Sequence, residues 1–203
     1  MKALFKNLLL LTALATLTFL SCDSRTEDEK WQAEIRYFFM QHNDDYRSYE
    51  PVSFQKIDLA YLESQEPIQK ALLVLQDTTK MRVKELQLAR LFETADEVMP
   101  FAQKFSIDQI DDYIKIKASV EGALKRKGNE ASEAYQQALR QEENALNLLS
   151  DVLSHFNLSI YSIDFANDPV IYFHEYLLDY MPRSAVFELN RESAEVISFR
   201  EVS

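Results

Sequence analysis

The sequence of 203 residues contains a single cysteine, Cys22. One cysteine cannot form a disulfide within the chain, so the fold has to be stable without internal crosslinks. The composition suits this requirement, because 47% of the residues are hydrophobic and 13 Phe and 10 Tyr supply large side chains. We therefore expect a globular fold that is stabilised by its hydrophobic core.

Glycine is scarce, and Gly122 and Gly128 are the only two in the chain. The phosphate-binding loops of nucleotide-binding enzymes need several closely spaced glycines. We therefore expect neither that class of enzyme nor any cofactor. The formal net charge is −11. A negative protein repels the phosphate backbone, so we also expect no nucleic acid partner.

Residues 1–22 read MKALFKNLLLLTALATLTFLSC. Lys2 and Lys6 form a positively charged start, and an uncharged, leucine-rich run follows up to Leu20. This run is shorter than the roughly 20 apolar residues that a membrane-spanning helix needs. A charged start followed by a short apolar run is typical of an export signal.

This segment resembles the signal peptide of a bacterial lipoprotein precursor. In that family the signal peptidase cuts before a cysteine that carries the lipid, and a small residue such as Ser21 precedes that cysteine. The resemblance implies that Cys22 is the lipid attachment site and that the protein is exported and anchored in the bacterial cell envelope. The membrane is then a partner, contacted through the acyl chains. The alternatives are cleavage just after Ser24 and an uncleaved signal anchor.

After the cysteine, we interpret the polar residues 23–30 as a tether and residues 31–203 as a single domain. Apolar residues at spacings of three and four predict a first helix from Trp31 to about His42. A partly alternating segment, residues 51–58, predicts a strand that Pro51 opens.

Helical periodicity covers residues 64–99, which predicts one long helix or two helices separated by a bend, with a stop at Pro100. Ser106 and Gln109 fit a capping box. They begin a predicted helical hairpin over about residues 106–156, inserted in the domain, with Gly128 as its left-handed cap. Apolar residues of the 64–99 segment form two stripes. The first consists of Ile68, Leu72, Leu75, Thr79, Val83 and Leu86, and the second consists of Met81, Leu88, Phe92, Ala95 and Met99.

The C-terminal part changes to strand periodicity. Segments 170–180, 185–189 and 194–202 predict a three-stranded antiparallel meander, which the early strand joins as a fourth. We therefore expect an α+β fold in which long amphipathic helices, including the αα-hairpin, pack on a small antiparallel sheet. The alternative is a helical bundle with an appended β-hairpin. The mature chain loosely resembles small bacterial lipoproteins, and no motif in it names a family.

Candidate metal and acid–base groups are scattered along the chain. The histidines fall in separate predicted elements, namely His42, His155 and His174. Metal sites need closely spaced ligands, so we expect no metal site. The acidic pairs Asp96-Glu97 and Glu142-Glu143 are adjacent on predicted helices, and adjacent helical residues do not share a face. We interpret both pairs as solvated helix surface.

Four residues with aromatic rings and polar tips share one face of the 170–180 segment: Tyr172, His174, Tyr176 and Tyr180. They form a candidate binding face, either as an exposed recognition surface or as a sheet face covered by a helix. We expect a non-enzymatic binding or scaffolding module with an envelope protein as a partner. The alternative is an envelope hydrolase with a non-standard carboxylate acid/base pair, and no catalytic residue can be assigned.

Overall fold

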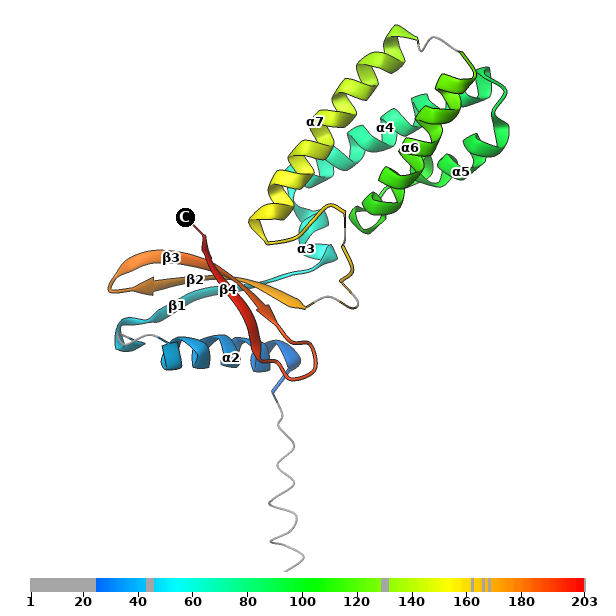
Figure 1. Cartoon of the computed structure of the whole chain (residues 1–203). Coiled ribbons are helices and arrows are strands. Elements are labelled where there is room, and N and C mark those ends of the chain that lie inside the picture. The colour runs from blue at the N-terminus through cyan, green and yellow to red at the C-terminus, as the bar shows by residue number, and fades with distance from the viewer. Residues whose placement is uncertain are drawn as a thin grey trace, which may run out of the picture.

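The computed structural model describes residues 25–42, 46–128, 132–161, 163–165, 167 and 169–202. It contains a four-stranded antiparallel sheet with one helix on one face and a group of helices beyond the other (Figure 1). This is the predicted α+β fold, with long helices packed on a small antiparallel sheet. Cys22 and the predicted signal segment lie outside the described residues.

The sheet has the order β1-β2-β3-β4, and each pair of neighbours is antiparallel. Its strands are β1 (Glu50–Ile57), β2 (Val170–Leu178), β3 (Met181–Leu189) and β4 (Val196–Val202). Strands β2 to β4 form the predicted meander, and β1 pairs with β2 as the predicted fourth strand. Asp179 and Tyr180 connect β2 to β3 with φ angles of 52° and 63°. Positive φ at both positions is the geometry of a type I′ turn.

Helix α2 (Glu27–His42) covers one face of the sheet (Figure 1). It begins before the predicted start because Thr26 and Glu29 cap it reciprocally, with backbone-to-side-chain hydrogen bonds of 2.7 and 3.2 Å. Residues 27–30 therefore belong to the helix, and the predicted tether over residues 23–30 is correspondingly shorter. The buried residues that join α2 to this sheet face are Trp31, Ile35, Phe39, Val170, Tyr172, Tyr176, Ala185, Phe187 and Leu189.

A helical insertion connects β1 to β2. Its helices are α3 (Leu59–Ser64), α4 (Glu66–Leu88), α5 (Phe92–Gln103), α6 (Ile110–Arg126) and α7 (Glu133–His155). Two short 3₁₀ helices accompany the larger elements, η1 (Tyr46–Ser48) and η2 (Ile107–Gln109). The hairpin predicted over residues 106–156 corresponds to α6 and α7, which are only the last part of this insertion. Its capping box at Ser106 and Gln109 is confirmed.

Two helices, α4 and α5, occupy the segment that was predicted as one long helix or two. The stop expected at Pro100 is wrong, because α5 continues to Gln103. Proline inside a helix removes one backbone hydrogen bond. Phe101 and Ala102 lie just beyond it and are buried in the core, and their burial favours continuing the helix.

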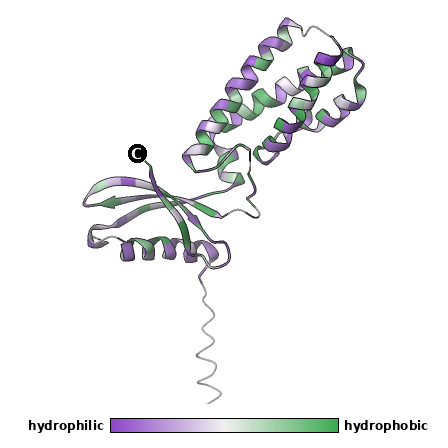
Figure 2. Cartoon of the chain, in the orientation of Figure 1, coloured by the Kyte–Doolittle hydropathy of each residue, from purple (hydrophilic) through white to green (hydrophobic). Residues whose placement is uncertain are grey.

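The two faces of the sheet belong to different cores, because successive side chains of a strand point to opposite faces. On the face away from α2, Ile57, Ile171 and Val186 join the core of the insertion, which includes Leu153 and Phe156. Hydrophobic and hydrophilic residues alternate around the helices in Figure 2, as expected of amphipathic helices. Within the described residues, no helix combines the length and the apolar character needed to cross a bilayer.

Candidate functional site

Three of the four residues of the predicted aromatic face are buried under α2. Tyr172, His174 and Tyr176 are 1%, 0% and 1% exposed, whereas Tyr180 in the β2–β3 turn is 86% exposed. The four residues therefore do not form a common exposed surface. The alternative of a sheet face covered by a helix is the one that the structure shows, because α2 removes the apolar parts of these rings from water.

The polar tips of the buried tyrosines are satisfied within the fold. The hydroxyl of Tyr172 donates to Asp28 of α2 at 2.7 Å, and that of Tyr176 donates to Glu201 of β4 at 3.2 Å. Burial raises the pKa of Tyr172 above its ordinary value. Burial also raises the pKa of Tyr176, to about 12. Both hydroxyls are therefore neutral donors at neutral pH.

His174 is also fixed by two hydrogen bonds. Its Nδ1 lies 2.5 Å from the carbonyl oxygen of Ser53, and its Nε2 lies 2.7 Å from the hydroxyl of Tyr49. A carbonyl only accepts, so Nδ1 carries the proton and Nε2 accepts from Tyr49. Burial lowers the pKa of His174 to about 4, against the opposing effect of the hydrogen bond to Ser53. The ring is therefore neutral at neutral pH and acts as part of the core.

The other two histidines lie on separate helices, His42 at the end of α2 and His155 at the end of α7. In the part of the chain that the structure describes, no group of three or more His, Cys, Asp or Glu residues is placed to hold a metal ion.

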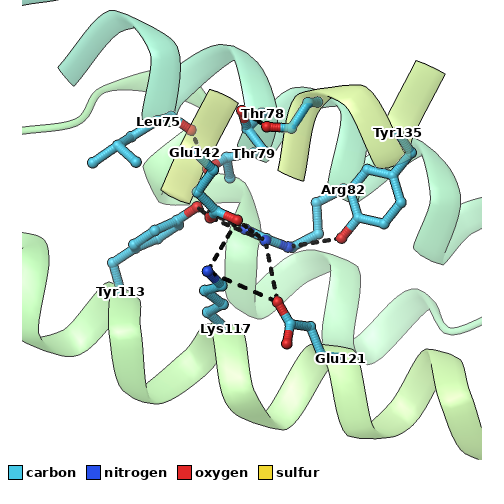
Figure 3. A network of polar contacts seen from close by, with 10 residues as sticks. Leu75, Thr78, Thr79, Arg82, Tyr113, Lys117, Glu121, Tyr135 and Glu142 are labelled. Carbon is cyan, nitrogen blue, oxygen red and sulfur yellow. Dashed lines mark hydrogen bonds and ion pairs between the residues drawn. The ribbon is translucent and has the colours of Figure 1, made fainter. Parts of the chain in front are cut away.

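A buried ion pair lies inside the helical insertion (Figure 3). Arg82 of α4 and Glu142 of α7 are both 0% exposed. The Nη2 atom of Arg82 lies 3.0 and 2.8 Å from the two carboxylate oxygens of Glu142. Two charges held together without solvent form the most polar point of an otherwise apolar core.

Two tyrosines complete the hydrogen bonding of this pair. Arg82 donates from Nη1 to the hydroxyl of Tyr113 of α6 at 2.7 Å and from Nε to that of Tyr135 of α7 at 3.0 Å. Tyr113 in turn donates to Glu142. Among the described residues, every buried side-chain nitrogen and oxygen atom has a hydrogen-bond partner. The network therefore joins α4, α6 and α7 without an unsatisfied polar atom.

The electrostatics keep both members of the pair charged. Burial alone raises the pKa of Glu142, but the charge and hydrogen bonds of Arg82, the hydrogen bond from Tyr113 and the charge of Lys117 outweigh it. The pKa of Glu142 therefore lies below its ordinary value. Burial alone lowers the pKa of Arg82, and the neighbouring Tyr113 and Glu142 reverse that effect and raise it.

The interpretation of Glu142 as solvated helix surface is wrong, whereas its neighbour Glu143 is exposed as expected. A signal in the sequence was available. Glu142 falls on the inner stripe of α7, and Arg82 falls on the inner stripe of α4 between Thr79 and Val83. Opposite charges on the apolar stripes of two neighbouring helices indicate a buried pair. The α7 stripe consists of Tyr135, Ala138, Glu142, Ala145, Leu149 and Leu153.

A pocket of about 330 Å³ opens between α6 and α7 beside this ion pair. Its lining consists of Ile114, Lys117, Ala118, Glu121, Leu146, Asn147, Ser150, Ile160 and Tyr161. Lys117 and Glu121 belong both to this lining and to the network (Figure 3). Lys117 Nζ lies 3.2 Å from Glu142, and Glu121 lies 3.9 Å from Arg82. The pocket therefore has an apolar wall and a charged wall that the buried pair supports.

This arrangement is suited to holding a small molecule with an apolar body and a charged group. It is poorly suited to acid–base catalysis. A general acid needs a raised pKa, whereas the pKa of Glu142 is lowered and its oxygens are engaged by Arg82, Tyr113 and Lys117.

Comparison of the sequence and the structure with known proteins gave no match among family models, curated proteins or solved structures.

Proposed function

We propose that the protein is a lipid-anchored component of the bacterial cell envelope that binds a small ligand between α6 and α7 without transforming it. The observation that carries this proposal is the pocket itself, in which Lys117 and Glu121 stand on the wall beside the buried Arg82–Glu142 pair.

The size and lining of the pocket support a binding role. Ligand pockets typically have volumes of about 300–1,000 Å³ and combine apolar walls with a few polar groups. This pocket is at the small end of that range, at about 330 Å³. Ile114, Leu146 and Ile160 contact the apolar part of the ligand, and its charged group lies at the end formed by Lys117 and Glu121.

The buried pair supports the proposal through pre-organisation. An ion pair inside a core is often no more stabilising than apolar residues of similar volume, so stability alone does not account for it. Glu142 holds Lys117 at 3.2 Å and Arg82 lies 3.9 Å from Glu121. Side chains that are fixed before binding lose less entropy when the ligand arrives.

Lipid anchoring at Cys22 comes from the sequence and remains a proposal. Because α2 begins at Glu27, only the residues between 22 and 27 separate the lipid from the folded domain. A fully extended chain spans at most about 3.5 Å per residue, so the start of α2 lies within roughly 18 Å of the membrane surface. The helical insertion lies beyond the face of the sheet that is opposite α2 (Figure 1), so on this proposal the sheet separates the pocket from the membrane.

Site-specific photo-crosslinking of the full chain in bacterial cells tests the binding proposal. A photo-reactive amino acid at Asn147 faces the pocket. The matched control is Gln141, another exposed amide on the same helix, about 120° away around the helix axis. We expect a small-molecule adduct in the intact mass of the Asn147 variant and none in that of the Gln141 variant. Equal adducts at both positions, or none at either, would contradict the proposal.

A further inference from the structure

A second hollow lies at the edge of the sheet, between α2 and the start of β4, and has a volume of about 300 Å³. Its lining consists of Glu34, Tyr37, Phe38, Gln41, His42, Glu195 and Val196. We call it the α2–β4 groove. The ring of Phe38 connects the groove to β4, since its centroid lies 5.3 Å from that of Phe199. Tyr37, Ile197 and Phe199 are exposed around it, so large apolar side chains surround the groove.

The groove lies where β4 begins, at one end of a sheet edge that pairs with no further described strand. Strand β4 is outermost and, among the described strands, is hydrogen-bonded only to β3. The pairing of β3 with β4 is irregular at one point. Glu188 pairs with Ser198, but the next residue, Leu189, pairs with Val196, so Ile197 is an extra residue on β4. From Ser198 to Val202 the strand is regular, and its outer backbone groups face no other described strand. An edge of this kind is able to pair with another chain.

The opposite edge of the sheet is protected. Strand β1 contains Pro51, which has no backbone N–H to donate, and its pairing with β2 shifts between Pro51 and Ser53. Strand β4 contains no proline. The side of β4 that faces the helical insertion is held in place, since Arg200 donates to the carbonyl of Ser154 at 3.0 Å. From Ser198 onward β4 has neither a proline nor a pairing irregularity, so this stretch is less protected than the β1 edge.

The charge of the groove indicates what it accepts. Its lining contains the carboxylates of Glu34 and Glu195 against one imidazole, that of His42. Glu201 adds a third carboxylate farther along the α2-facing side of β4, where it is shared with Tyr176 and Arg183. The whole chain carries a net charge of −11, so a second copy brings like charge to this edge. A basic segment complements it.

We propose that the α2–β4 groove binds an extended, basic segment of a partner protein, which adds to the sheet as a fifth strand beside β4. Backbone groups between Ser198 and Val202 pair with this segment. Its alternate side chains point toward α2, where apolar ones pack on Phe199 and Tyr37 and basic ones meet the carboxylates. This site is separate from the α6–α7 pocket and does not depend on the function proposed for that pocket.

Peptide binding to the full-length protein in detergent tests this proposal by fluorescence anisotropy. The probe is a labelled, end-capped octapeptide in which valine and lysine alternate at every second position and threonine fills the positions between them, so that valine and lysine share one face of the strand. A second probe replaces lysine by glutamate, and a third keeps the lysines but is N-methylated at every residue. The third has the charge and the side chains of the first but lacks backbone donors along both of its edges. Strand addition predicts that both altered probes bind at least about tenfold more weakly than the first.

Variants of the protein locate the site. The double variant Glu34→Lys/Glu195→Lys is expected to weaken binding of the lysine probe at least about tenfold. The control Asp96→Lys/Glu97→Lys changes the net charge equally at two exposed positions of α5 and is expected to leave the affinity within about twofold. Circular dichroism checks that all variants are folded.

Three outcomes would overturn the proposal. Equal binding of the N-methylated probe would mean that charge alone attracts the peptide. Equal loss of affinity in the α5 control would place the attraction outside the groove. A dimer in sedimentation of the full chain in detergent that Ile197→Asp abolishes would assign this edge to a second copy.

Discussion

Arg82 and Glu142 are 60 positions apart in the sequence and meet as an ion pair with no exposed surface. Each lies on the inner stripe of its helix, α4 or α7, among residues that are mostly apolar. Placing two charges at one point of a core costs desolvation free energy, which their attraction and hydrogen bonds offset. The pair therefore fixes how α4 and α7 pack against each other.

Breaking this pair from one side is expected to be strongly destabilising. Glu142→Leu leaves the guanidinium of Arg82 buried without a carboxylate partner at hydrogen-bond distance, which typically costs about 3–5 kcal/mol. The double variant Arg82→Met/Glu142→Leu removes both charges and should recover a large part of this loss. Urea denaturation of the wild type, Glu142→Leu, Arg82→Met and the double variant gives the comparison. Losses that simply add in the double variant would show that the two charges are not coupled.

His174 is expected to make the protein sensitive to moderate acid. Its pKa is lowered in the folded state, from 6.5 to about 4, so the unfolded chain binds the proton first. The stabilisation by the neutral ring is complete above about pH 6.5 and is lost as the pH falls toward about 4. At about pH 4.5 the expected loss in the free energy of unfolding is about 2–3 kcal/mol relative to neutral pH.

The matched variant for this effect is His174→Gln, which keeps a donor and an acceptor but does not titrate in this range. Denaturation at about pH 7 and about pH 4.5 should show a smaller loss in the variant than in the wild type by about 2–3 kcal/mol. Carboxylates titrate in both proteins, so only the difference between them reports on the histidine. Equal pH dependence of the two proteins would contradict the buried, neutral state of His174.

The former candidate binding face provides a test of burial. Tyr172→Ala and Tyr176→Ala empty sites under α2, and each is expected to lower the free energy of unfolding by about 3–5 kcal/mol. Tyr180→Ala changes an exposed turn residue and should cost less than about 0.5 kcal/mol. Chemical denaturation measures all three. Similar small losses in the free energy of unfolding at all three positions would mean that Tyr172 and Tyr176 are exposed rather than buried under α2.

The architecture was largely predictable from local patterns. Strand periodicity located the meander and β1, because residues on a half-buried strand alternate between core and solvent. The α4 stripe from Ile68 to Leu86 is buried as the helical spacing predicted. Pro100 misled the prediction, because the burial of Phe101 and Ala102 depends on tertiary packing that the local pattern does not contain.

The candidate sites were less predictable. The spacing of Tyr172, His174 and Tyr176 showed that they share a face but not whether a helix covers it, since that depends on α2, far away in the sequence. The α6–α7 pocket depends on the packing of helices around it, which periodicity does not specify. Glu142 was placed on the surface because it was compared with its neighbour Glu143 rather than with the positions three and four residues away.

Acylation at Cys22 is the part of the account that one measurement tests most directly. Cells that express the wild type, Cys22→Ser or Cys22→Ser/Ser24→Cys are grown with labelled palmitate, and the protein is isolated in detergent. We predict a label on the wild type alone, because only a thiol at position 22 accepts the lipid, and a displaced thiol in the double variant does not. Equal label on the wild type and Cys22→Ser would contradict the lipid anchor and, with it, the proposed place of this protein in the cell envelope.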